Sequence, residues 1–164
     1  MESIEGEPFM SYEIEVRDVE PQAMVSIRTE CHAAEIGATL QEILPEVWSY
    51  LQRAGVKPAG PPFTRYHGYV DNRADIEGGM PVAEALPGEG RITAGELPGG
   101  SVVTTIHMGP YEKLPEAHDA LHVRMREQNK EAAGPQWEFY LTDPGLEPDP
   151  YKRKTELVWP IKDA

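Results

Sequence analysis

The chain has 164 residues, enough for one domain with a sizeable buried core, and its formal net charge is -13. This acidity argues against direct binding to nucleic acid or to an anionic membrane, and it favours encounter with cations. The one cysteine, Cys31, permits no internal disulfide, and no apolar run is long enough to cross a membrane. We therefore expect a cytoplasmic protein without a signal peptide.

The first half of the chain is predicted to contain strands and one long helix. Residues 1–10 are acidic and are expected to form a flexible extension. Alternating apolar and charged residues predict a strand over 11–17, and a second strand follows around Val25. Apolar residues at helical spacing predict a helix over 33–54, which Pro45 should kink or break. Two more strands are expected at 62–70 and 75–83.

The second half repeats this order after a loop at 87–90. A helix is predicted over 112–129, and the strands are expected at 91–97, 101–108, 136–142 and 154–161. The repeat has support from individual residues, because the segment 62–66 aligns with 136–140.

Each half is therefore predicted to be a β-β-α-β-β unit, with the repeats at about 11–86 and 90–162 of a single domain over 11–164. Two such units predict an α+β fold with pseudo-twofold symmetry. Its strands would form an eight-stranded curved sheet or open barrel, with the two long helices outside. Concave binding sites tend to form at such interfaces.

The strand at 136–142 carries the strongest functional signal. Successive strand residues point to opposite faces. One face therefore carries Trp137, Phe139 and Leu141, which suggest core, and the other carries Glu138, Tyr140 and Thr142. The polar face is either an ordinary solvated surface or the anchor of a pocket. The repeat pairs Tyr66 with Tyr140 but aligns Glu138 with Thr64, so the carboxylate belongs to one half only.

Several other residues are candidates for the same pocket or for a different site. Tyr111 follows a Gly-Pro turn at the predicted start of the second helix, and His107 ends the strand before it. Trp159 lies on a mostly apolar strand face and suits either core or pocket. His118 and His122 have the spacing of a helical metal pair, but no third ligand is evident, so we expect no metal.

Ordered motifs in the chain resemble the GyrI-like small-molecule-binding family, also described as the AraC-type or multidrug-regulator effector-binding domain. The motifs are Glu96-Leu97-Pro98-Gly99-Gly100, His107-Met108-Gly109-Pro110-Tyr111, Trp137-Glu138-Phe139-Tyr140-Leu141-Thr142-Asp143-Pro144 and Thr155-Glu156-Leu157. The resemblance spans roughly 11–162 and implies a duplicated fold related to that of the SOUL haem-binding proteins. The chain looks like a stand-alone member, without a DNA-binding helix-turn-helix.

The resemblance implies a ligand cleft between the halves, lined by aromatic residues, with a central glutamate at Glu138. In drug-binding members that glutamate faces cationic aromatic ligands. We therefore expect an apolar or cationic aromatic small molecule as ligand, and no cofactor. The expected binding residues are Glu138, Tyr140, Tyr111, Tyr66, His107 and Trp159.

Two alternatives to simple binding follow from other stand-alone members of the family. One is a hydrolase that opens strained cyclopropane rings, with Glu138 and Tyr111 as catalytic residues. The other is a protein-interaction module of the gyrase-inhibitor type, for which the acidic surface would meet a basic partner. Haem binding, suggested only by the fold relationship, is the weakest option.

Overall fold

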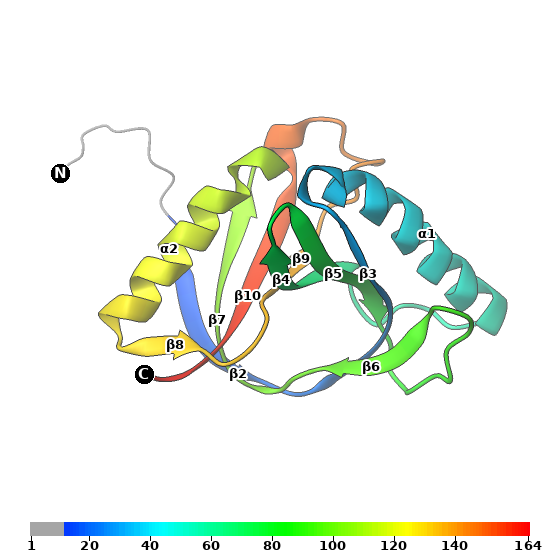
Figure 1. Cartoon of the computed structure of the whole chain (residues 1–164), viewed down its shortest axis with the longest axis horizontal. Helices are drawn as coiled ribbons and strands as arrows, with labels where there is room; N and C mark the ends of the chain where they lie inside the picture. Colours follow the sequence, from blue (N-terminus) through cyan, green and yellow to red (C-terminus); the bar gives the residue numbers. More distant parts are fainter. Residues whose placement is uncertain (1–11) are drawn as a thin grey trace.

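The computed structural model describes residues 12–164 (Figure 1). The extension predicted over 1–10 lies outside the described residues. The first half contains the strands β2 (Ile14–Val19), β3 (Gln22–His32), β4 (Phe63–Val70) and β5 (Arg73–Pro81), and the helix α1 (Ile36–Ala54). The second half contains β6 (Thr93–Leu97), β7 (Gly100–Met108), α2 (Leu114–Glu127), β9 (Trp137–Tyr140) and β10 (Lys154–Asp163). These elements confirm the predicted order.

The short elements were not anticipated. Single 3₁₀ turns precede both helices, at Ala33–Glu35 and Tyr111–Lys113, and a third lies at Pro150–Lys152. The strand β8 (Lys130–Ala132) pairs with the end of β10. It is three residues long and largely exposed, so it carries little of the apolar alternation by which a strand is recognised in sequence.

The sheet order shows how the two halves combine. Eight antiparallel strands run in the order β2-β7-β10-β9-β4-β5-β3-β6. In the repeat, β2 corresponds to β6, β7 to β3, β10 to β5 and β9 to β4. Exchanging the halves therefore gives the same order of strands, read from the opposite edge of the sheet. The pseudo-twofold axis therefore passes between β9 and β4, and the predicted α+β duplicated fold is confirmed. Each half lends its first strand to the other half, since β2 pairs with β7 and β6 pairs with β3.

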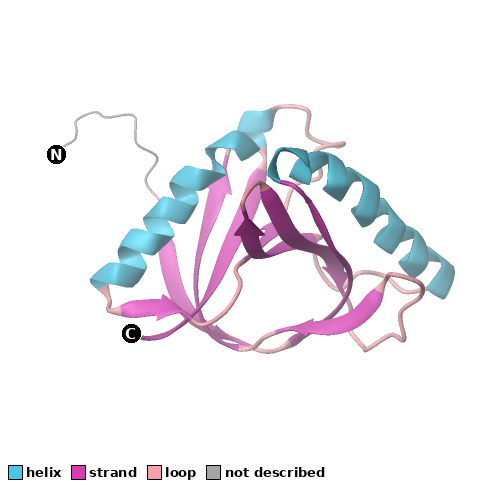
Figure 2. Ribbon diagram, in the orientation of Figure 1, coloured by secondary structure: helices cyan, strands magenta, loops and turns pink. Residues whose placement is uncertain are grey.

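The two helices cover one side of the curled sheet, α2 over the second half and α1 over the first (Figures 1 and 2). Each helix contributes to its own apolar cluster. α1 packs through Ile43, Val47 and Leu51 against β3, and α2 packs through Ala117 and Leu121 against β7 and β10. A third cluster fills the opposite, inner side of the sheet: Met24, Phe63, Leu97, Val102, Trp137 and Val158. β4 and β9 lie between the helices, in the middle of the sheet.

Two local expectations need correction. α1 is a single helix, so of the two effects predicted for Pro45, a kink or a break, the break is wrong. Pro45 lies on the exposed side, while the buried face of the helix on either side of it is held against the sheet. Leu141 does not belong to the core, since it is 43% exposed. β9 ends at Tyr140 because the chain then enters a turn, in which the Asp143 carboxylate accepts the Gly145 N–H at 2.8 Å.

We expect Gly79→Ala to destabilise the fold. Gly79 lies in β5 between Ser26 of β3 and Phe63 of β4, and a Cβ there would overlap the carbonyl oxygen of Val25. Overpacking of this kind lowers the free energy of unfolding by about 1–3 kcal/mol, which urea denaturation would measure. Gly37→Ala is the matched control, because its Cβ meets none of the described atoms within 4 Å and alanine favours a helix. Equal stability of the two variants would contradict the close approach of β3 and β5.

Candidate functional site

Glu138 lies at the centre of the sheet, next to the pseudo-twofold axis. It lies in β9 opposite Thr64 of β4, and its side chain is on the face of the sheet that the helices cover. The residue is only 2% exposed. Its Oε1 accepts hydrogen bonds from the hydroxyls of Tyr66 and Tyr140, each at 3.2 Å. The two tyrosines predicted to be equivalent therefore meet on one carboxylate oxygen.

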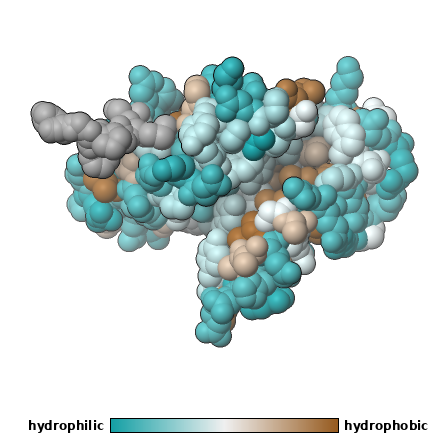
Figure 3. Space-filling model, turned by 90° about the horizontal axis from the view of Figure 1, so that it is seen from above, coloured by the Kyte–Doolittle hydropathy of each residue, from teal (hydrophilic) through white to brown (hydrophobic). Residues whose placement is uncertain are grey.

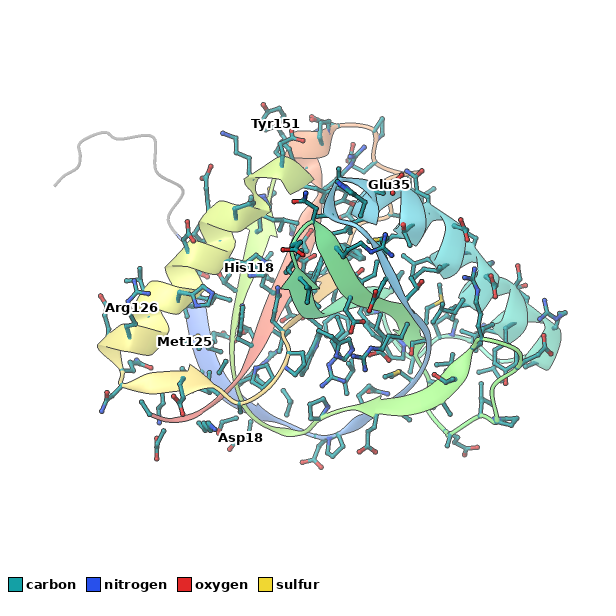
Figure 4. All side chains as sticks on the ribbon, viewed as in Figure 1. Asp18, Glu35, His118, Met125, Arg126 and Tyr151 are labelled. Atoms are coloured by element: carbon teal, nitrogen blue, oxygen red, sulfur yellow. The ribbon has the colours of Figure 1, made fainter. Side chains whose placement is uncertain are left out.

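His118 of α2 holds the other carboxylate oxygen. Its Nε2 lies 3.0 Å from Glu138 Oε2, and its Nδ1 lies 3.2 Å from the indole Nε1 of Trp159. An indole N–H can only donate, so Nδ1 of His118 must be the acceptor. The imidazole proton is then on Nε2 and is donated to Glu138. This chain of hydrogen bonds fixes His118 as a neutral tautomer that projects from α2 toward the strands (Figure 4).

A second layer of contacts supports the tyrosines. The Tyr140 hydroxyl lies 2.8 Å from Thr64 Oγ1. Because a carboxylate only accepts, the Tyr140 proton serves Glu138 and the Thr64 hydroxyl supplies the proton of this second bond. The ring of Tyr111 meets the ring of Tyr140 edge-on, with centroids 6.0 Å apart, and the Arg153 guanidinium lies 5.7 Å from the Tyr111 centroid. Tyr111 therefore contacts the site through an aromatic neighbour.

Burial keeps the tyrosines of this site protonated. It raises the pKa of Tyr66 well above its usual value, and the neighbouring Tyr140 and Glu138 add to the shift. The pKa of Tyr140 is raised for the same reasons, with burial the larger cause and the Glu138 charge the next. The pKa of Tyr111 is also raised, again chiefly by burial. Both hydroxyls that face Glu138 thus remain hydrogen-bond donors at neutral pH.

An open groove adjoins this network. It arises because β4 continues beyond the start of β9, where the last contact is the hydrogen bond from Tyr66 N–H to the Gln136 carbonyl at 3.0 Å. The groove has a volume of about 420 Å³. It is lined by Tyr66, His67, Gly68 and Tyr69 of β4, by the segment 134–136, and by Trp159. Seen from above, the surface is largely hydrophilic, with smaller hydrophobic patches between the hydrophilic residues (Figure 3).

The predicted site residues thus take different positions. Glu138, Tyr66 and Tyr140 form direct contacts, and Trp159 links the network to the groove. His107 is fully buried away from this network, with Nε2 donating to the Pro110 carbonyl at 3.1 Å and Nδ1 accepting from the Tyr12 hydroxyl at 3.0 Å.

Sequence reasoning did not anticipate Thr64 or Gln136 as members of the site, and it considered His118 only as a metal ligand. A histidine on the apolar stripe of α2 was the available signal for His118, but it gave no partner. Among residues 12–164, no group of three or more His, Cys, Asp or Glu side chains could hold a metal ion. Within the same range, no helix is both long and apolar enough to span a membrane.

The family model of the GyrI-like small molecule binding domain matches residues 12–162, and the chain belongs to this family. The C-terminal domain of EcmrR has a similar structure, with a TM-score of 0.85 and 22% identity over 94% of this chain and 100% of that domain. The EcmrR chain in its complex with DNA matches with a TM-score of 0.84 and 22% identity over 96% of this chain. The match spans only 60% of that longer chain.

More distant solved structures share the fold as well. A hydrolase encoded by lin2189 from Listeria innocua has a TM-score of 0.66 and 15% identity, over 92% of each chain. SAV2435 bound to tetraphenylphosphonium has a TM-score of 0.65 and 13% identity, over 93% of this chain and 94% of that one. At such identities the likeness shows the fold alone. A search of curated proteins gave no match.

The raised pKa values predict a loss of stability in alkali. The unfolded chain releases a tyrosine proton near pH 10, whereas folded Tyr140 keeps it. The unfolded state then binds fewer protons, so the free energy of unfolding falls as the pH rises, by about 1.4 kcal/mol per pH unit for each such tyrosine. Below pH 10 both states keep the proton, so the stabilisation that comes from the raised pKa of Tyr140 is fully present.

Urea denaturation between pH 8 and pH 11.5 would measure this slope, which should be shallower in Tyr140→Phe than in the unmodified protein. Equal slopes would contradict the burial of the Tyr140 hydroxyl in the folded state.

Proposed function

We propose that the protein binds small, aromatic or largely apolar cations beside Glu138, whose carboxylate supplies the countercharge. One observation carries the proposal. Glu138 is 2% exposed, and its hydrogen-bond partners, Tyr66, Tyr140 and His118, are all neutral. No lysine or arginine within residues 12–164 forms an ion pair with it. A buried charge without a countercharge is unfavourable, so a bound cation would stabilise it.

The groove next to this carboxylate suits a flat or cationic ligand. Tyr66, Tyr69 and Trp159 line it and offer aromatic surfaces for stacking and for cation–π attraction. Its volume of about 420 Å³ is in the range of small-molecule sites. The net charge of -13 would also favour the encounter of a cation with the protein.

The groove and the carboxylate are connected by two side chains. Tyr66 lines the groove and donates its hydroxyl proton to Glu138, and Trp159 lines the groove and donates to His118. Rotation of the Tyr66 ring would remove one hydrogen bond and expose the carboxylate to the groove. The fold shared with SAV2435, which has been solved with tetraphenylphosphonium, supports this class of ligand and provides a probe.

Glu138→Gln should lower the affinity for tetraphenylphosphonium at least tenfold. The substitution keeps the shape of the side chain and removes the charge that attracts the cation, an effect of about 1.4 kcal/mol or more. Isothermal titration calorimetry would measure it. Glu84→Gln makes the same change in net charge at an exposed position and should bind as the unmodified protein does. Equal binding by both variants would rule out Glu138 as the anchor.

The position of the ligand can be tested with Gly134. It lines the groove, and a Cβ at this position would meet none of the described atoms within 4 Å. Gly134→Val should therefore leave thermal stability nearly unchanged while it narrows the groove, and tetraphenylphosphonium should bind more weakly. Unchanged affinity in this folded variant would place the ligand elsewhere.

The second candidate function is the hydrolysis of a strained cyclopropane conjugated to a carbonyl group. It is favoured by the juxtaposition of Glu138 with Tyr66 and Tyr140, whose raised pKa values keep them protonated. Water would attack one ring carbon and give its proton to Glu138. The ring bond would break toward the carbonyl, and a tyrosine would protonate the resulting enolate. Proton return from Glu138 to the tyrosine completes the net addition of one water.

Mass spectrometry would detect such a product as the substrate plus one water. Turnover should disappear in Glu138→Gln and persist in Glu84→Gln. Tyr111, the predicted assisting residue, contacts Tyr140 rather than Glu138, so Tyr111→Phe should reduce turnover less than Glu138→Gln does. An unmodified protein that binds tetraphenylphosphonium but leaves the cyclopropane intact would contradict this second function.

The other expectations from the sequence stay predictions: a cytoplasmic location, no direct contact with nucleic acid, and a possible protein partner of the gyrase-inhibitor type.

A further inference from the structure

We infer that Gln136 is a second acceptor in the groove, and that the site selects aromatic cations that carry N–H donors, such as amidinium ions. This inference rests on the proposed function and adds the chemical class of the cationic group. It begins from the position of Gln136, which lies immediately before β9 and lines the groove together with Tyr66 and Trp159.

Gln136 and Glu138 are two residues apart along the same extended segment, so their side chains point to the same side of the sheet. The backbone of Gln136 is fixed, because its carbonyl accepts the Tyr66 N–H at 3.0 Å. Tyr66 also donates its hydroxyl proton to Glu138. The backbone carbonyl of Gln136 and the carboxylate of Glu138 therefore both accept a hydrogen bond from the same residue of β4.

The side-chain oxygen of Gln136 lacks a hydrogen-bond donor among the described residues. Its Oε1 is buried and has no hydrogen-bond partner within residues 12–164. Buried acceptors in folded proteins are almost always paired, and an unpaired one marks a place where a donor from outside the chain would be stabilising. Because Gln136 lines the groove, a rotation of its side-chain amide would turn Oε1 toward a donor on a ligand bound there.

Two neighbouring acceptors define the chemistry of the ligand. A carboxylate and an amide oxygen on one strand face match a planar cation with several N–H groups, as in an amidinium, since one N–H can face each acceptor. His118 already shows that Glu138 Oε2 takes an N–H donor at 3.0 Å. A quaternary ammonium or phosphonium ion has no N–H and would leave Gln136 Oε1 unpaired. The aromatic walls would accept the ring system of either kind of ligand.

The inference can be tested with two probes that differ in donors but not in charge. Naphthalene-2-carboxamidinium carries N–H donors, and trimethyl(naphthalen-2-yl)ammonium carries none. We expect calorimetry to show a preference of the unmodified protein for the amidinium of at least tenfold, because hydrogen bonds that involve a charged group are stronger than those between neutral groups. Gln136→Met, which keeps the size of the side chain but lacks the acceptor, should reduce the preference several-fold by weakening amidinium binding alone, while the hydrogen bond to Glu138 keeps part of it.

Gln136→Glu is the matched second variant, because it keeps an acceptor at the same position and should retain the preference. The ratio of the two affinities is the readout, and a partly unfolded variant does not alter it. A preference as large in Gln136→Met as in the unmodified protein, or a loss of affinity that is equal for both probes, would overturn the inference.

The outcomes of this test separate the inference from the proposed function. If Glu138→Gln weakens both probes while Gln136→Met leaves their ratio unchanged, the proposed function stands and the role of Gln136 is wrong. If the unmodified protein binds neither probe, both conclusions fail. If Glu138→Gln leaves both affinities unchanged, the proposed function fails.

Discussion

The structure is organised around one buried carboxylate that accepts several hydrogen bonds but pairs with no lysine or arginine among the described residues. Glu138 sits where the two halves of the sheet meet, and its donors come from both halves: Tyr66 from the first, and Tyr140 and His118 from the second. A charge in this position is tolerated only if several donors converge on it. The packing of α2 and the pairing of β4 with β9 both contribute to that convergence, so the site depends on the tertiary structure as a whole.

Two other carboxylates, one buried and one half-buried, lie close to arginine side chains. On the inner side of the sheet, Glu77 accepts from Ser26 at 2.5 Å and from His67 at 2.8 Å, with the Arg65 guanidinium 4.0 Å away. Its counterpart Glu156 pairs with Arg17 at 3.0 Å. These two glutamates are related by the repeat, and each has an arginine nearby. Glu138 has a threonine as its counterpart, and no lysine or arginine among the described residues forms an ion pair with it, which supports the ligand-binding role that we propose.

The sequence predicted the framework well because that framework repeats. Alternation and helical spacing located the main strands and both helices, and the internal repeat gave the pseudo-symmetry that the sheet order shows. Local patterns failed where packing overrides propensity or where a signal is too short. Pro45 remains inside one helix because the buried face holds it, and the exposed turn after Tyr140 removes Leu141 from the core. β8 is too short and too polar to produce a pattern.

The sequence by itself determined that Glu138 and Tyr140 share a strand face, that Tyr66 is the counterpart of Tyr140, and that the carboxylate has no counterpart. These facts follow from the two-residue period of a strand and from the repeat. Only the tertiary structure decided that His118 reaches Glu138, that Trp159 fixes its tautomer, and that Gln136 lines the groove with its Oε1 unpaired among the described residues. Side-chain direction is set locally, but the partner across a sheet or beneath a helix depends on strand register and helix docking, which no local pattern encodes.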